Sequence, residues 1–170
     1  MLTPGREFWR LHFLDRVWPR GTYAMAKWST SAPRQVEAIK GACLMLRRSA
    51  LDQVGLLDKD YFMYTEEVDL CYRLALSGWE LWYVPQAVVT HLGGASSSQM
   101  AETMYVQLYR SKLQFYRKFG GERRARLAKL LYLVAYAPRW LVAAGLARLR
   151  PEYAVRARTY RHLLADLPGM

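Results

Sequence analysis

The carboxylates best placed to do chemistry lie within residues 65–79, TEEVDLCYRLALSGW. At roughly 100° per residue, a helix here would place Glu67 on a stripe of apolar or small residues, namely Leu70, Cys71, Leu74 and Gly78. Glu66, Asp69 and Arg73 would lie on the other side, where we expect solvent. Because an ionised carboxylate is costly to bury without a partner, Glu67 is a candidate for a functional site or a cleft.

The same residues also have a purely structural interpretation. Thr65 is a natural N-cap, and the two glutamates after it would stabilise the helix N-terminus by roughly 0.3–1 kcal/mol each. Asp69 and Arg73 are four residues apart, which predicts an ion pair along the helix. His91, taken alone, is more typical of a hydrogen-bonded structural histidine. The residue types alone therefore leave both interpretations open.

The elements that must position these residues are short and of mixed type. Glycine and proline positions divide the chain, and Ser49 and Gly55 are the expected N-cap and end of one short helix. Apolar periodicity predicts helices over residues 7–17, 50–54, 65–78 and 101–119 and strands over 36–46, 80–84 and 87–91.

Composition indicates a folded chain with a basic C-terminal part. The 170 residues are 52% hydrophobic and carry a net charge of +11. Residues 101–170 hold 14 Lys and Arg against 4 Asp and Glu, whereas residues 1–100 are nearly balanced. Such a segment suits nucleic acid or an anionic membrane. Two apolar blocks, 130–137 and 140–147, are divided by Pro138 and Arg139, which predicts a kinked helix or helical hairpin at a bilayer interface.

Several common chemistries are not indicated. The sequence contains no G-x-x-x-x-G-K-[ST], G-x-G-x-x-G, C-x-x-C, H-E-x-x-H or G-x-S-x-G pattern. No RNA-binding signature accompanies the basic part, so we expect no nucleic-acid partner. Cys43 and Cys71 lie in apolar segments and predict buried free thiols in a reducing compartment. The N-terminus lacks the apolar core of a secretory signal, so no such signal is expected.

Five blocks, in order, carry a family resemblance. They are KGACLMLRR (40–48), VGLLDKDYFMY (54–64), EEVDLCYR (66–73), GWELWYVP (78–85) and VTHLGGAS (89–96). Their sequence and spacing resemble the C-terminal half of family-2 glycosyltransferases of the GT-A fold, with particular likeness to bacterial rhamnosyltransferases of cell-surface polysaccharide synthesis. The likeness covers residues 36–121.

The resemblance implies roles for particular residues. Glu67 is the implied general base and Glu66 is the preceding member of the acidic pair, although the family usually has Asp at the position of Glu67. His91 is the implied ligand of a divalent metal, Mg²⁺ or Mn²⁺. The turn Gly41-Ala42-Cys43 resembles the segment that lines the acceptor side of the cleft.

The Asp-x-Asp pattern at residues 58–60 is interpreted as a false match to the family's metal-binding motif. It lies just before the catalytic helix, where the family has a similar acidic turn that does not bind the metal.

The expected architecture is α/β: the C-terminal portion of a Rossmann-like GT-A domain with a helical, membrane-associating extension. Residues 1–34 are an irregular lead-in, 35–121 the catalytic half and 122–170 a basic amphipathic extension. The implied function is a truncated or split, inverting transferase that moves sugar from a nucleotide-sugar donor to a glycan or lipid-linked acceptor. It would lie in the cytoplasm against the anionic membrane, and a separate chain could supply the donor half. The alternative is an inactive membrane-associated remnant or assembly partner.

Overall fold

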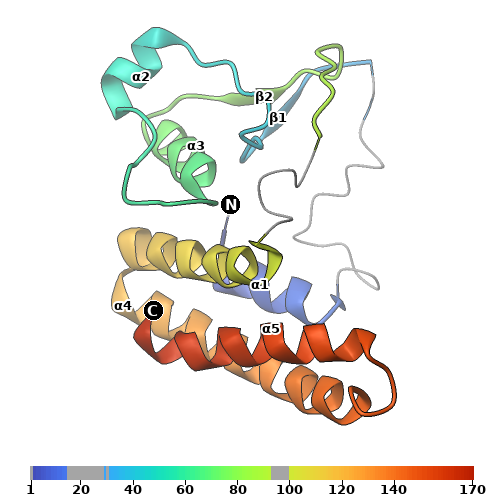
Figure 1. Cartoon of the computed structure of the whole chain (residues 1–170). Coiled ribbons are helices and arrows are strands. Elements are labelled where there is room, and N and C mark those ends of the chain that lie inside the picture. Colours follow the sequence, from blue (N-terminus) through green and yellow to red (C-terminus); the bar gives the residue numbers. More distant parts are fainter. Residues whose placement is uncertain (1, 15–28, 30, 93–99) are drawn as a thin grey trace. The chain divides into compact units, whose positions relative to one another are not determined.

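The computed structural model describes residues 2–14, 29, 31–92 and 100–170, which belong to two compact units (Figure 1). One unit includes residues 23–95 and the other includes residues 3–22 and 96–170. Of the described residues, most are helical, and two short strands form a two-stranded sheet. We refer to the two units as the mixed unit and the helical unit.

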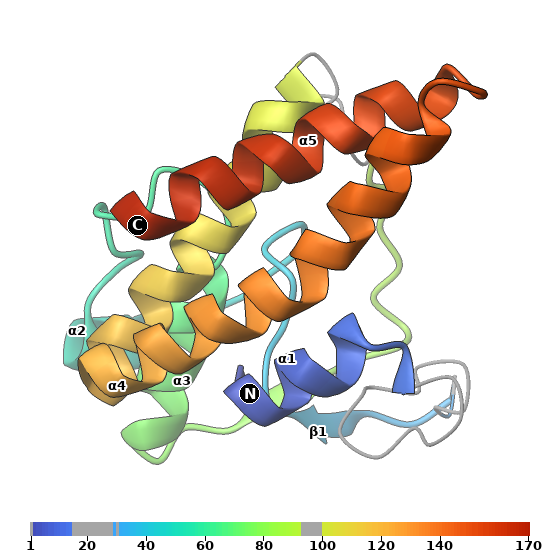
Figure 2. The same cartoon turned by 90° about the horizontal axis from the view of Figure 1, so that it is seen from below.

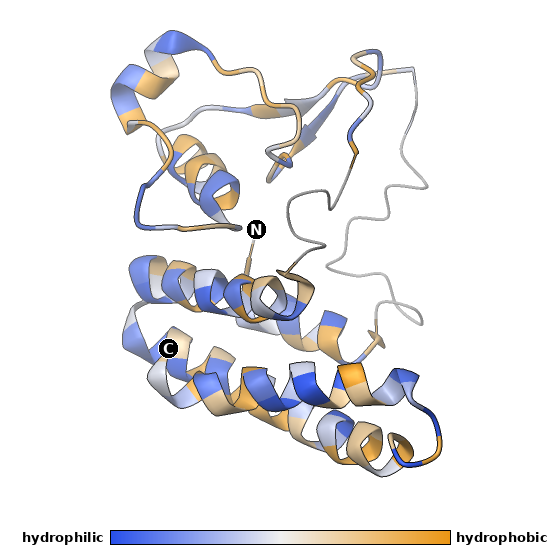
Figure 3. Cartoon of the chain, in the orientation of Figure 1, coloured by the Kyte–Doolittle hydropathy of each residue, from blue (hydrophilic) through white to orange (hydrophobic). Residues whose placement is uncertain are grey.

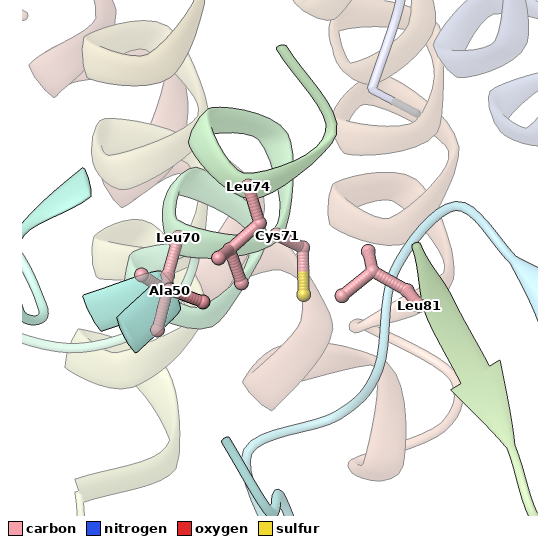
Figure 4. Packing of buried hydrophobic residues seen from close by; sticks show 5 residues of the cluster. All are labelled: Ala50, Leu70, Cys71, Leu74 and Leu81. Carbon is pink, nitrogen blue, oxygen red and sulfur yellow. The ribbon is translucent and has the colours of Figure 1, made fainter. Parts of the chain in front are cut away.

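The mixed unit contains two helices and an antiparallel pair of strands. Its elements are β1 (Arg34–Val36), α2 (Arg48–Val54), α3 (Glu66–Leu76) and β2 (Leu81–Tyr83). The two strands pair with Gln35 opposite Trp82. A small apolar core holds them to the helices, and Figure 4 shows its buried members, Ala50, Leu70, Cys71, Leu74 and Leu81. Leu81 is the strand residue that this core buries, so β2 is anchored to α3 through it.

The predicted elements of the mixed unit are confirmed in part. The helix over 65–78 and a strand within 80–84 are present, and Gly55 ends α2 with a φ of 82°. However, α2 begins at Arg48 after Arg47, so Ser49 is not its N-cap. The strands predicted over 36–46 and 87–91 were wrong, except that Val36 ends β1. Within the described residues β1 pairs only with β2, which leaves the apolar run after it without a neighbouring strand.

The helical unit consists of α1 (Pro4–Leu11), α4 (Ala101–Leu146), α5 (Glu152–Asp166) and a 3₁₀ turn, η4 (Leu167–Gly169). Gly121 interrupts α4 with a φ of 69°, and the chain turns back there, so that α4 has two arms (Figure 2). Glycine adopts this left-handed conformation without steric cost. The predicted end of the first arm at residues 120–121 is therefore confirmed.

The second arm, residues 122–146, does not break at its proline. Pro138 lies inside the helix, and the guanidinium of Arg139 donates to the carbonyl of Ala135 at 2.5 Å. The helix is continuous from residue 122 to residue 146, so the helical hairpin predicted between the two apolar blocks was wrong. At the other end of the chain, α1 is shorter than the predicted helix over 7–17, of which residues 15–17 lie outside the described part.

The helical unit is held together by aromatic and charged side chains. Aromatic side chains of the first arm pack inside the unit: Tyr109 stacks edge-on against Tyr132 with ring centroids 4.7 Å apart. Glu7 of α1 is buried and accepts from the Lys112 ammonium at 2.5 Å and from Arg10 at 2.9 Å. This buried ion pair fastens α1 to α4.

Candidate active site

Two residues in an unusual backbone conformation lead into α3. Tyr64 and Thr65 have φ angles of 67° and 73°, in the left-handed region that side chains other than glycine rarely adopt. For a β-branched residue such as Thr65 the conformation is a clear outlier, and such strain costs on the order of 1–3 kcal/mol per residue. Thr65 is the N-cap as predicted, but its side chain forms no capping hydrogen bond. Strain of this kind is concentrated at functional sites.

The acidic pair begins the helix directly after these residues. Glu66 and Glu67 are both half-buried, and one carboxylate oxygen of each is buried with no hydrogen-bond partner among the described residues. Burial raises the pKa of Glu67, and the charge of Glu66 raises it further. Backbone N–H groups of Glu67 and Val68 and the charge of Lys40 offset only part of this shift. Glu67 therefore holds a proton more readily than an exposed glutamate.

The turn that was predicted to line the acceptor side lies against Glu67. A Cβ placed on Gly41 would be 3.5 Å from the Cβ of Glu67, so the backbone of the turn approaches this side chain closely. The thiol of Cys71 lies on the same side of α3 and contacts the Ile39 carbonyl at 3.9 Å. Burial raises the pKa of this thiol, and the charge of Glu67 contributes to the shift. The structure thus brings the turn at 39–41 and Glu67 together.

Asp69 is the residue for which the helical projection was wrong. Its side chain is fully buried, although the projection placed it toward solvent. Its carboxylate accepts from Arg73 at 2.6 Å, as predicted, and also from the Tyr61 hydroxyl at 3.3 Å. Arg73 in turn donates to the carbonyls of Val54 and Leu56. These bonds tie the middle of α3 to the end of α2 and to the following loop, and so hold the strained entry in place.

A cleft of about 470 Å³ opens beside the same core. It is lined by residues between the turn and α2, such as Leu44 and Arg47, and by residues in and just before β2, such as Trp79 and Trp82. The indole N–H of Trp79 donates to Gln53 at 2.8 Å, which fixes the orientation of that ring. Glu67 is not among the lining residues, so the cleft and the acidic pair are separate features of the mixed unit.

The other predicted site residues are on the surface. Ala42 and Cys43 are exposed, so the thiol of Cys43 is not buried as predicted, and both cysteines are free. His91 is exposed and lies outside any helix or strand. Within the described part of the chain no three His, Cys, Asp or Glu residues group together as a metal site would require. The described residues alone do not assemble the predicted metal centre, and no contact described for Glu67 includes His91.

Sequence reasoning missed the supporting residues rather than the acidic pair. Nothing in the periodicity identified Tyr61 or the left-handed pair before α3. The only sequence signal for this site was an acidic residue, Glu66, at the start of a helix that follows an aromatic loop. That signal indicated a functional site only together with the blocks that resemble the family. Asp69 could have been found from its spacing to Arg73, but not its burial.

The chain matches a known family over most of the site just described. The profile of the family described as "Glycosyltransferase like family 2" matches residues 10–109, more than half of the chain. The match includes β1, α2, α3 and β2 and the first part of α4. No solved structure was found to match the chain.

The similarity to curated relatives extends over a smaller part of the chain than the match to the family profile. The chain is 44% identical over 81 residues to N-acetylglucosaminyl-diphospho-decaprenol L-rhamnosyltransferase of Mycobacterium tuberculosis, which is 46% of this chain and 26% of that protein. It is 41% identical over 56 residues to rhamnosyltransferase WbbL of Escherichia coli, covering 33% of this chain and 21% of the relative. The match thus spans about a quarter of the length of the first of these proteins. By the family profile, the chain belongs to glycosyltransferase family 2.

Proposed function

We propose that this chain is the acceptor-side portion of an inverting GT-A glycosyltransferase that builds cell-surface or lipid-linked glycans. The observation that carries the proposal is the acidic pair at the start of α3, where burial raises the pKa of Glu67 next to the turn containing Gly41. Family membership and the named rhamnosyltransferase relatives support a sugar-transfer reaction.

Glu67 acts as the general base in the proposed reaction. Its carboxylate takes the proton of the acceptor hydroxyl while the hydroxyl oxygen forms a bond to the anomeric carbon of the donor sugar. The bond from that carbon to the nucleoside diphosphate breaks, and the diphosphate leaves with the electron pair. Because attack comes from the face opposite the leaving group, the configuration inverts. A raised pKa suits this role, since a base works best when its pKa approaches the operating pH.

The surrounding residues position the base. Glu66 keeps the pKa of Glu67 high through its charge, and the turn 41–43 forms the acceptor side of the site. The strained Tyr64-Thr65 entry fixes the first turn of α3, where a displacement on the order of 1 Å would cost about 100-fold in rate. The acceptor is a hydroxyl on a glycan or a lipid-linked sugar, in keeping with the diphospho-decaprenol in the name of one relative.

We also propose that the site is completed by a donor-binding half that supplies the nucleotide-sugar pocket. His91 would be one ligand of a divalent metal, Mg²⁺ or Mn²⁺, which would neutralise the diphosphate when bound. The other ligands would come from that half. In this arrangement the protein works in the cytoplasm at the membrane surface, where a lipid-linked acceptor is available.

Paired substitutions test the base. In the complete transferase that contains this segment, Glu67→Gln should lower kcat by about 100-fold or more, the usual size of a general-base contribution. Glu66→Gln should have a much smaller effect, because it removes only a neighbouring charge. Equal losses in the two variants would rule out Glu67 as the base.

Titration calorimetry with nucleoside diphosphate and Mn²⁺ tests whether the chain acts alone. Binding by the isolated chain would indicate a self-sufficient transferase. No binding, with binding restored when a donor half is added, supports the split or partial enzyme. If an added donor half restores neither binding nor transfer, the chain is instead the inactive, membrane-associated assembly partner.

A further inference from the structure

The second arm of α4 is apolar on the side that faces away from its neighbours. In Figure 3 much of this arm has hydrophobic colours, whereas α5 is more hydrophilic. Its inward residues, including Ala128, Tyr132, Ala135 and Ala143, are all buried. On the opposite side lies what we call the outer stripe, which consists of Leu127, Leu130, Val134, Leu141 and Gly145. At 100° per residue these five positions fall within an arc of about 60°.

The outer stripe is exposed over its whole length. Leu130 is 55% exposed, Val134 53% and Leu141 63%. With a rise of 1.5 Å per residue, the stripe is about 27 Å long. A helix at the surface of a water-soluble domain normally presents polar residues on this side, so a continuous apolar stripe marks a surface that binds something.

The charges around the stripe indicate an anionic partner. Residues 123–150 contain seven Lys and Arg and no Asp or Glu. Two of them, Lys129 and Arg139, bond carbonyls within the helical unit, which leaves five around the stripe. Arg123 and Arg148 lie in line with the stripe, one beyond each end, and neither has an ion-pair partner in the described part of the chain. A second copy docked on this stripe would bring two such basic surfaces face to face, and repulsion opposes that arrangement.

The packing of the opposite side indicates that the helix lies on a bilayer rather than across it. By length and composition α4 could span a membrane, since it includes a window of mean hydropathy 1.3, of which 28% is buried. However, the rings of Tyr136 and Tyr160 pack with centroids 5.3 Å apart and so join this arm to α5. Spanning would carry the charged side chains of α5 into hydrocarbon, which is costly.

We propose that the outer stripe of α4 is a membrane-docking surface that lies flat on an anionic bilayer, with leucines in the acyl region and the flanking arginines at lipid phosphates. This inference deepens the membrane location proposed above by naming its surface. Membrane docking does not require sugar transfer. Vesicle binding can therefore fail while transfer persists, and transfer can fail while vesicle binding persists.

Vesicle co-sedimentation of the full chain tests the proposal. The wild type should bind mixed phosphatidylcholine–phosphatidylglycerol vesicles and bind pure phosphatidylcholine weakly. Leu130→Asp/Leu141→Asp should lower affinity for the mixed vesicles by at least about tenfold, because acyl-region burial is lost and negative charge is added. The matched control is Leu57→Asp/Leu76→Asp, which changes two similarly exposed leucines of the mixed unit and should bind like the wild type.

Four results would overturn the proposal. One is a wild type that does not bind the mixed vesicles, and another is an equal loss in the stripe variant and the control, with circular dichroism showing both folded. The third is a stripe variant that binds vesicles normally but turns a dimer into a monomer in sedimentation equilibrium, which would assign the stripe to a second copy. Alkaline extraction should release the wild-type chain from vesicles, and retention would show that α4 spans the bilayer.

Discussion

At the scale of single residues, the candidate site depends on two neighbouring, half-buried glutamates in the first turn of α3. Glu67 has a raised pKa because it is buried, and it faces the turn at Gly41, whereas Glu66 contributes its charge. A carboxyl group whose pKa is raised by burial and by a neighbouring like charge is typical of acid–base chemistry. Tyr64 and Thr65, immediately before them, have a left-handed backbone conformation, so the chain accepts conformational strain at the start of this helix.

The first prediction concerns the proton of Glu67 in the chain as it stands. Carboxyl carbon NMR across a pH titration should show Glu67 titrating above the ordinary 4.5 of a glutamate. Glu66→Gln should lower that midpoint, since the like charge beside Glu67 is removed. A midpoint for Glu67 that is unaffected by Glu66→Gln would show that the two carboxylates do not interact.

At the scale of elements, α3 depends on a buried ion pair that has an exposed counterpart in α2. Asp69 and Arg73 pair at 2.6 Å with the carboxylate fully buried, whereas Arg48 and Asp52 pair at 2.8 Å in solvent. Both pairs are four residues apart and join the same two residue types. The pairs differ in burial and in the order of Asp and Arg along the helix, and Asp69 and Arg73 also bond Tyr61 and two backbone carbonyls. The comparison therefore sets a buried network against an isolated exposed pair.

The second prediction follows from that comparison. Asp69→Ala should lower the free energy of unfolding by about 3 kcal/mol, because it removes the buried carboxylate that accepts from Arg73 and from the Tyr61 hydroxyl. Asp52→Ala should change it by at most about 0.5 kcal/mol, the usual value of an exposed helical pair. Urea unfolding measures both. Similar small losses in the two variants would mean that the Asp69 network does not stabilise α3.

At the scale of the whole molecule, local patterns were easier to predict than tertiary relationships. The helix at Glu67, the end of α2 at Gly55 and the change of direction at Gly121 depend on short-range chemistry, and all three are present. The strand predicted over 36–46 failed because a strand needs a partner, and Met45 within that run is 96% exposed. Periodicity cannot supply such a partner.

The burial of Asp69 was missed for a related reason. A helical projection assumes one buried face, but Tyr61 and Arg73 cover Asp69 from the preceding loop and from the next turn of the helix. Those contacts come from tertiary packing. The role of Glu67 could be predicted only through the family blocks, because an acid in a first helical turn is also a common stabilising residue.

The last prediction is that lowering the pH changes the stability of the two units in opposite directions, through Glu7 in the helical unit and Glu67 in the mixed unit. Glu7 in the helical unit is buried, which by itself would raise its pKa, but the charges of Lys112 and Arg10 outweigh burial and leave the pKa below 4.5. Its contribution to stability is therefore present above pH 4.5 and is lost as the pH falls through the lowered folded-state pKa.

In the mixed unit, burial raises the pKa of Glu67 above 4.5. Between pH 4.5 and this raised folded-state pKa, the folded state therefore binds more protons than the unfolded state. Ionising Glu67 thus costs stability at neutral pH, and this cost disappears as the pH falls toward 4.5.

Hydrogen exchange monitored by mass spectrometry at several pH values, corrected for intrinsic exchange, can follow each unit separately. On acidification from pH 7 to about 4.5, protection in α3 should increase relative to a Glu67→Gln variant, in which the glutamate proton no longer contributes. Below about 4.5, protection in α1 and the first arm of α4 should decrease, and Glu7→Gln should be less stable at neutral pH but less sensitive to acid. Parallel loss of protection in both units, unchanged by either substitution, would show that these two carboxylates do not set the acid response, which would then come from the remaining charges of this strongly basic chain.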